Sequence, residues 1–143
     1  MNNESIGYAL HHLVFILDRQ SDEALRANLN VGYSQFKILM AAKHKAGLKQ
    51  NDIAGFLGQT EASVSRQIKL LKQDGLLSVQ IDPANRRARS IVLTSKGADL
   101  GRQCVEVLEH EHSAVFGSLS FAEQKLTREL LERLIVKALG KSK

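Results

Sequence analysis

The feature that most constrains the fold is a change of hydrophobic period between residues 60 and 94. Over residues 60–73 the apolar side chains recur at helical spacing, and Asp74 and Gly75 then end the helix, because glycine accepts the left-handed conformation that follows a helix end. Residues 76–81 alternate apolar and polar side chains as a strand does, and residues 90–94 are a second β-rich run. The pattern predicts a helix followed by a β hairpin with a long tip.

The rest of the chain has the apolar spacing of α-helices. Helices are predicted at about residues 5–27, 33–45, 50–57 and 95–117, and a last helix follows the run SFAE at residues 120–123. In that run the serine caps the helix and the glutamate reaches back to the preceding backbone. The length of 143 residues suits one domain with one core. We therefore expect a mainly α-helical single domain in which a helix-turn-helix is followed by a small β wing.

Composition favours a cytoplasmic globular protein. Hydrophobic residues make up 43% of the chain and charged residues 24%, which is an ordinary globular balance. No apolar run approaches the roughly 20 residues needed to span a bilayer, and the N-terminus lacks the pattern of a signal peptide. The single cysteine, Cys104, excludes an intrachain disulfide and fits a reducing compartment. We expect no membrane association and no cofactor.

Positive charge is concentrated in the middle of the chain. Residues 37–96 contain 11 Lys or Arg and four Asp or Glu, whereas the remaining residues contain nine and 11. The formal net charge of +5 therefore comes from the segment that holds the predicted helix-turn-helix and wing. A basic segment of this kind provides the surface that a polyanion such as DNA needs, although an ordinary solvated surface has the same composition.

The helix predicted at residues 60–73 has an apolar face and a polar face. Val64, Ile68 and Leu71 form the apolar stripe, which is expected to dock on the preceding helix. Serines can bond phosphates or base edges, an arginine can form two hydrogen bonds with guanine, and a threonine can cap the helix start. The candidate DNA contacts on this helix are therefore Thr60, Ser63, Ser65, Arg66 and Lys69. A solvated amphipathic helix is the alternative.

Three arginines lie between the two predicted strands, on the expected tip of the hairpin. Arg86, Arg87 and Arg89 follow Pro83, the only proline in the chain. Arginine on a thin projection suits the minor groove of DNA, where the narrow width concentrates negative potential. Charges on a hairpin tip are usually only solvated, so their position directly after a helix-turn-helix is what favours DNA binding.

Together these motifs resemble the MarR family of bacterial winged helix-turn-helix transcription regulators. The matching runs are GYSQFKIL at residues 32–39, LKQNDIA at 48–54, SVSRQIKLLKQDGLL at 63–77 and DPANRRARSIVLTSKG at 82–97. The resemblance implies a DNA-binding lobe at residues 33–97. It also implies a helical dimerisation region, made of residues 1–29 and 98–143, that interlocks two subunits.

The resemblance also implies roles for individual residues. In this family the helix that holds Ser63, Ser65 and Arg66 enters the major groove of double-stranded DNA, and the wing arginine, here Arg86 or Arg87, reaches the minor groove. A homodimer would place its two recognition helices on a pseudo-palindromic operator. Repression is the family's common mode, and small phenolic or other aromatic ligands commonly release its members from DNA.

Two positions depart from the family's pattern. The family usually has Thr or Ser where this chain has Lys49, so we expect the helix at residues 50–57 to lack its usual cap, and Lys49 could contact phosphate instead. The wing usually has Asp where this chain has Asn85. Either Asp82 substitutes as the partner of the wing arginine, or the tip of the wing is looser.

An effector would bind between the dimer helices and the DNA-binding lobe, as the resemblance implies. The candidate pocket residues are His11, His12, Phe15, Phe36 and Met40, although apolar residues at such positions more often belong to a core. The sequence names neither the ligand nor the operator.

Other functions have weaker support in the sequence. Cys104 lies on an apolar helix stripe, so a structural thiol is favoured over a redox sensor. His110 and His112 lie on opposite sides of a helix and cannot hold one metal ion together, although His11, His12 or His44 could complete a site across helices. The chain has no phosphate-binding glycine loop and no HExxH motif, so we expect no enzyme. A winged helix that binds only protein is a further alternative, against which the wing arginines argue.

Overall fold

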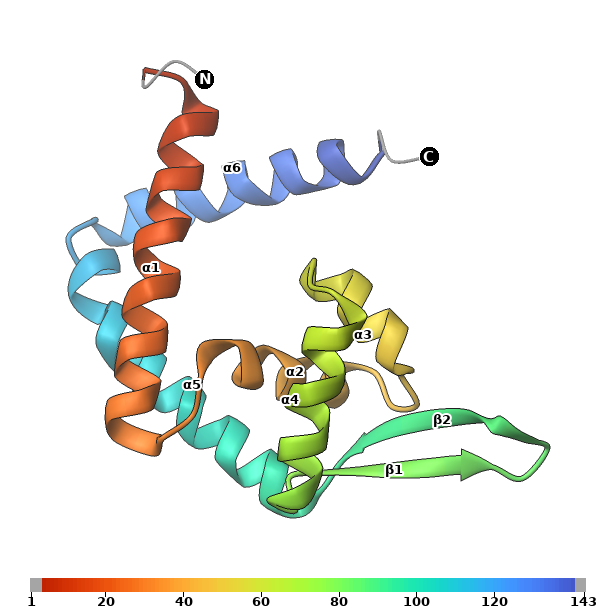
Figure 1. The fold of residues 1–143 in the computed structure, drawn as a ribbon. Coiled ribbons are helices and arrows are strands. Elements are labelled where there is room, and N and C mark those ends of the chain that lie inside the picture. The colour runs from red at the N-terminus through yellow and green to blue at the C-terminus, as the bar shows by residue number, and fades with distance from the viewer. Residues whose placement is uncertain (1–3, 141–143) are drawn as a thin grey trace. The chain divides into compact units, whose positions relative to one another are not determined.

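The computed structural model describes residues 4–140, which form six helices and one two-stranded sheet. Figure 1 shows the elements in chain order: α1 (Ile6–Leu29), α2 (Tyr33–His44), α3 (Gln50–Leu57), α4 (Glu61–Gln73), β1 (Leu77–Asp82), β2 (Asn85–Leu93), α5 (Ser95–Phe116) and α6 (Phe121–Gly140). The predicted order of helices around one hairpin is confirmed. By its contacts the chain divides into two compact units, residues 1–108 (the N-terminal unit) and residues 109–143 (the C-terminal unit).

The core of the N-terminal unit consists of two clusters of buried side chains. The larger cluster joins α2, α3, α4 and the hairpin, and its fully buried members include Ile38, Leu39, Ile53 and Val64. The smaller cluster contains Leu25, Val31 and Cys104, with Tyr33 and Phe36 packed against it. The predicted apolar stripe of α4 is confirmed, since Val64, Ile68 and Leu71 are all buried.

Backbone geometry places the helix ends where the sequence predicts them. Gly58 follows α3 with φ 64° and ψ 30°, a left-handed conformation that glycine adopts without steric cost. Gly75 has φ 74° directly after the Asp74 cap of α4. The chain can therefore turn sharply between α3 and α4, and again between α4 and β1, which keeps the helix-turn-helix and the wing adjacent in space.

The hairpin differs from its prediction in one respect. β1 and β2 pair antiparallel from Leu77 opposite Leu93 to Ile81 opposite Arg89, and Asp82 then pairs with Asn85. β2 therefore begins at Asn85, five residues before the predicted run, and the three arginines lie in this strand rather than in a long tip. The prediction was wrong because residues 85–89 lack the apolar alternation that marks a strand in a sequence. Their backbone nevertheless pairs with β1, and a bulge between Ile81 and Asp82 lets the pairing continue to Asn85.

The C-terminal unit contains the end of α5 and all of α6. The predicted capping box is confirmed: the Ser120 N–H donates to Glu123 Oε2 over 2.8 Å, and the Glu123 N–H donates to Ser120 Oγ over 3.2 Å. None of the residues of α6 is buried, although many are large and apolar. In the part of the chain that the structure describes, no helix combines the length and apolar character needed to cross a membrane.

Candidate nucleic-acid interface

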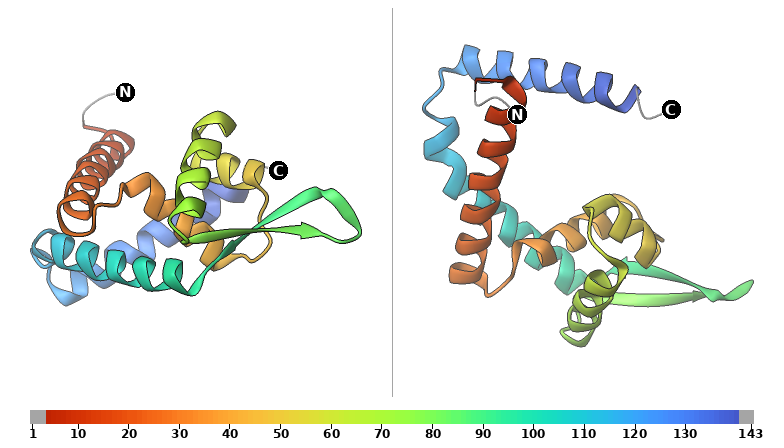
Figure 2. Two further views of the ribbon diagram at one scale, coloured as in Figure 1. Left: turned by 60° about the horizontal axis from the view of Figure 1, so that its bottom comes forward. Right: turned by 45° about the horizontal axis from the view of Figure 1, so that its top comes forward.

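Helix α4 presents a basic, hydroxylated surface on the side opposite its buried stripe. Thr60 begins the helix as predicted, because its Oγ1 accepts a hydrogen bond from the Ser63 N–H over 3.1 Å. The side chains of Ser65, Arg66 and Lys69 are exposed. Because the stripe of α4 is fixed in the core, these three side chains must face away from it. Figure 2 shows α4 beside the hairpin in two further views.

Ser63 has a different environment from the other candidates on α4. It is half-buried, and its Oγ lies 3.2 Å from Gln67 Nε2 and 3.5 Å from Gln59 Oε1. Gln59 in turn donates to Ser34 Oγ over 2.7 Å, so the network reaches α2. Neither Gln59 nor Gln67 was predicted as a functional residue from the sequence. Their spacing of eight residues, with Ser63 halfway between them, is the only sequence signal for this contact.

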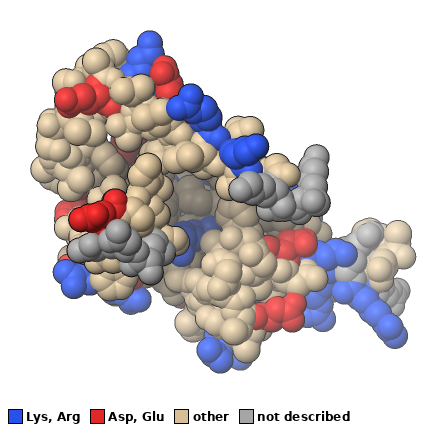
Figure 3. Space-filling view, turned by 90° about the horizontal axis from the view of Figure 1, so that it is seen from above, with Lys and Arg blue, Asp and Glu red and all other residues tan. Residues whose placement is uncertain are grey.

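The wing presents its arginines on strand β2. Arg87 and Arg89 are exposed, whereas the side chain of Arg86 is outside the described part of the structure. Asn85 Oδ1 accepts a hydrogen bond from the Arg87 N–H over 3.2 Å, so this residue holds the backbone of the turn rather than a guanidinium. Among the described side chains, ion pairs form within α1 and α5 and none is seen on the wing. Figure 3 shows Lys and Arg side chains along the wing, which extends to the right.

A groove of about 470 Å³ lies between the start of α3, helix α4 and the wing. Its lining residues are Lys49, Gln50, Asn51, Glu61, Ile68, Lys72, Val79, Asn85, Arg87, Arg89 and Ile91. Four of these side chains are cationic and one, Glu61, is anionic, so the groove favours an anionic ligand. Lys72 was not among the predicted contacts, although its position on the wheel of α4, beside the buried stripe, could have revealed it.

The start of α3 has the cap chemistry that its sequence predicts. Lys49 makes no side-chain cap, and its own backbone N–H donates to Asp52 Oδ2 over 3.1 Å. The ammonium group of Lys49 is therefore available to the groove. Asp82, the other candidate partner for the wing arginines, has a side chain outside the described part of the structure.

Comparison with known proteins identifies the family to which these elements belong. The model of the MarR family matches residues 32–88, which contain α2, α3, α4 and most of the wing. This segment of the chain matches the MarR family. Its relatives include the transcriptional regulator HosA of Escherichia coli O111:H-, which is 24% identical over 101 residues that cover 71% of this chain and 75% of HosA.

Several solved structures have the same fold. Apo MarR from E. coli superposes with a TM-score of 0.85 at 21% identity, over 94% of this chain and 98% of that one. CouR from Rhodococcus jostii RHA1, bound to p-coumaroyl-CoA, gives 0.75 at 20% identity, over 92% of each chain. BpsR from Bordetella bronchiseptica, whose DNA binding is regulated by 6-hydroxynicotinic acid, gives 0.74 at 25% identity, over 94% and 95%.

The winged helix fold predicted for this chain is thus confirmed. Its relatives are transcriptional regulators, which supports DNA-binding regulation as its general function.

The candidate effector residues lie in two different settings. His11, His12 and Phe15 are exposed on α1. Phe36 stacks on Tyr33 with ring centroids 6.0 Å apart, beside the smaller core cluster, and Met40 packs against the larger one. None of the five lines the basic groove. Any pocket that unites them stays a prediction.

The sensor alternatives gain no support from the described residues. Cys104 is buried, and this burial raises the pKa of its thiol to about 11, which suppresses the reactive thiolate. Among the side chains that the structure describes, no three from His, Cys, Asp or Glu lie close enough to hold a metal ion. The thiol therefore has the environment of a structural residue.

Proposed function

We propose that this chain is a homodimeric, sequence-specific repressor that a small aromatic ligand releases from DNA. The observation that carries the proposal is the exposed cationic surface that α4 and the wing present together, with Arg66 and Lys69 on α4 and Arg87 on β2. The basic groove adds Lys72 and Arg89 between the two elements, although Ser65, Arg66 and Lys69 do not line it. A DNA duplex needs cationic groups on both a groove-reading helix and its flank, because phosphate contacts fix the register while base contacts select the sequence. The match of residues 32–88 to the MarR family agrees with this use of the surface.

The exposed side chains of α4 and of the wing have different proposed roles in binding DNA. Ser65 and Arg66 would read base edges in the major groove, with Lys69 beside them, and Thr60 would hold the start of the helix. Arg87, with Arg86 and Arg89 on the same strand, would enter the minor groove. Ser63 is engaged within the protein, so its role would be to support α4 rather than to contact DNA.

The proposed dimerisation region is residues 1–29 and 98–143. Its support is the number of large apolar side chains that α1 and α6 leave exposed; Ile6 is 74% exposed, Phe15 65% and Val136 71%. Exposed apolar surface on this scale marks an interaction site. α6 has apolar residues around most of its circumference, which is typical of a helix that is covered from more than one side.

The proposed effector is a small aromatic compound. CouR has been solved with p-coumaroyl-CoA, and BpsR responds to 6-hydroxynicotinic acid, and both compounds contain an aromatic ring. In this chain His11, His12, Phe15, Phe36 and Met40 are the side chains proposed to contact such a ring. The existence of an effector is tested by its ability to release the protein from its operator.

The proposed function is tested by selecting purified protein against a randomised duplex pool at about 150 mM salt, where nonspecific binding is weak. We expect an inverted repeat to be enriched. Arg87→Ala should then weaken operator binding by on the order of 1–3 kcal/mol, whereas Lys43→Ala, which removes one positive charge from an exposed position of α2 outside the groove, should have little effect. If folded, dimeric protein enriches no sequence, or if Arg86→Ala and Arg87→Ala both bind as tightly as wild type, the proposal for the wing fails.

A further inference from the structure

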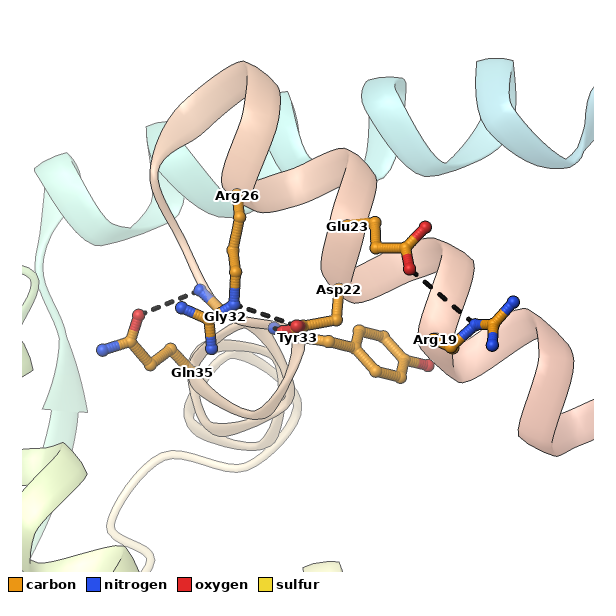
Figure 4. A network of polar contacts seen from close by, with 7 residues as sticks. All are labelled: Arg19, Asp22, Glu23, Arg26, Gly32, Tyr33 and Gln35. Carbon is orange, nitrogen blue, oxygen red and sulfur yellow. Dashed lines mark hydrogen bonds and ion pairs between the residues drawn. The ribbon is translucent and has the colours of Figure 1, made fainter.

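The first turn of α2 is held by a side chain from α1. Asp22 Oδ1 accepts a hydrogen bond from the Tyr33 N–H over 2.9 Å, and Asp22 Oδ2 accepts one from Arg26 Nε over 2.9 Å (Figure 4). The Tyr33 N–H is one of the donors that a helix leaves unpaired at its start, and Gly32 before it has no side chain to act as a cap. The cap of α2 is therefore supplied by another helix.

The neighbouring contacts fix this joint further. The Gly32 N–H donates to Gln35 Oε1 over 3.1 Å, and a Cβ at Gly32 would lie only 2.9 Å from Arg26 Nη2 (Figure 4). The Tyr33 N–H and the Arg26 guanidinium hold the pKa of the Asp22 carboxyl below its usual range. Asp22 therefore stays ionised at neutral pH and acts as a permanent acceptor between α1 and α2.

The same turn of α2 is also tied to the recognition helix. Ser34, the residue after Tyr33, accepts a hydrogen bond from Gln59 Nε2 over 2.7 Å. Gln59 Oε1 in turn accepts from Gln67 Nε2 on α4 over 3.0 Å. Tyr33 is thus bonded to Asp22 of α1, and Ser34 is bonded to Gln59. Gln59 in turn is bonded to Gln67 of α4.

These hydrogen bonds constrain the orientation of the helices in a way that the apolar core does not. Burial of apolar surface stabilises the packing of α2 against α4 but has no preferred direction, whereas a hydrogen bond requires a short distance and a defined angle. The chain of contacts from Asp22 through residues 33–34 to Gln59 and Gln67 therefore limits how far α4 can rotate relative to α1.

We propose that Asp22 and Gln59 are positioning residues that set the separation of the two recognition helices in the dimer, and hence the half-site spacing that the protein accepts. The inference rests on the proposed function, because it requires α1 to belong to the dimer interface. Neither residue contacts DNA in this proposal. Each acts through the orientation of α4 on α1.

The first test needs no DNA. A spin label on Gln73→Cys, at the exposed end of α4, reports the distance between the two recognition helices of a dimer, and the buried Cys104 stays unlabelled. We expect a narrow distance distribution that Asp22→Ala, which removes the acceptor of the Tyr33 N–H, and Gln59→Met each broaden. The matched controls, Glu23→Gln beside Asp22 and Gln80→Met at an exposed position of β1, should leave it narrow.

The second test uses the selected operator with its half-sites moved one base pair closer together or further apart. For each variant we expect the ratio of its affinities for the original and the altered spacing to fall by about 2- to 30-fold. Mutations along such networks change coupling between sites by this amount. Where Asp22→Ala fails to fold, Ser34→Ala removes the acceptor of Gln59 with a smaller change. Folded dimeric variants that keep the wild-type distribution and spacing preference overturn the inference alone. A monomeric wild-type protein overturns the proposed function together with it.

Discussion

Gly97 provides the sharpest test of how the wing is attached to the helices. A Cβ added at this residue would lie 2.1 Å from the carbonyl oxygen of Leu76 and 2.7 Å from Leu93 Cδ1. The Leu76 oxygen already accepts the Thr94 N–H over 3.2 Å, so it is fixed by the base of the hairpin. Gly97→Ala must therefore push α5 away from the wing. Overpacking of a well-packed site typically costs about 1–3 kcal/mol, and a clash with backbone should lie at the upper end.

Two other glycines in helices are matched controls for the same chemical change. At Gly55 on α3 no atom lies within 4 Å of the added Cβ, so Gly55→Ala should stabilise the protein by roughly 0.5–1 kcal/mol through helix propensity alone. At Gly101 the nearest atom is Met40 Cε at 2.6 Å, the end of a flexible side chain, so the cost should be intermediate. Urea unfolding followed by circular dichroism, at one protein concentration, measures all three. A Gly97→Ala variant as stable as Gly101→Ala would refute the reasoning.

Three further predictions follow from single features of the structure. Thr60→Ala should lower the free energy of unfolding by about 1 kcal/mol because it removes the cap on the Ser63 N–H, while Thr60→Ser should retain it, as urea unfolding would show. Since burial raises the pKa of Cys104 to about 11, iodoacetamide should modify native protein far more slowly than protein in urea, and equal rates by mass spectrometry would contradict this. Because α6 buries none of its residues within one chain, the thermal midpoint should rise with protein concentration, and a constant midpoint in calorimetry would argue against a dimer.

Most of the fold was predictable because local signals and apolar spacing agree with each other. α3 spans the predicted residues 50–57, which are bounded by a helix start and by Gly58. The capping box at Ser120 and Glu123 forms as written in the sequence. The buried stripe of α4 follows from its period alone, since three side chains on one face of a helix must share one environment.

The features that escaped prediction depend on contacts between distant residues. β2 extends to Asn85 because a backbone ladder needs a neighbouring strand and not an apolar sequence. The contact from Asp22 to Tyr33 spans 11 residues and that from Gln59 to Ser34 spans 25, and polar side chains at such separations carry no periodic signal. Lys72 enters the groove only because the wing folds back beside α4. In each case the partner of a polar group depends on the tertiary structure and not on the local sequence.

The exposed side chains of α4 and α6 differ in kind, and this difference suits the two helices to different partners. α4 leaves Ser65, Arg66 and Lys69 in solvent, which suits a hydrated, charged partner whose binding weakens as salt rises. α6 leaves leucine, isoleucine and valine in solvent, which suits an apolar partner whose binding is not weakened by screening of charge. Raising the salt concentration should therefore separate the two activities, releasing DNA while the proposed dimer persists. The positioning role proposed for Asp22 and Gln59 requires this difference, because it would relate the geometry of a stable dimer interface to that of a reversible DNA interface.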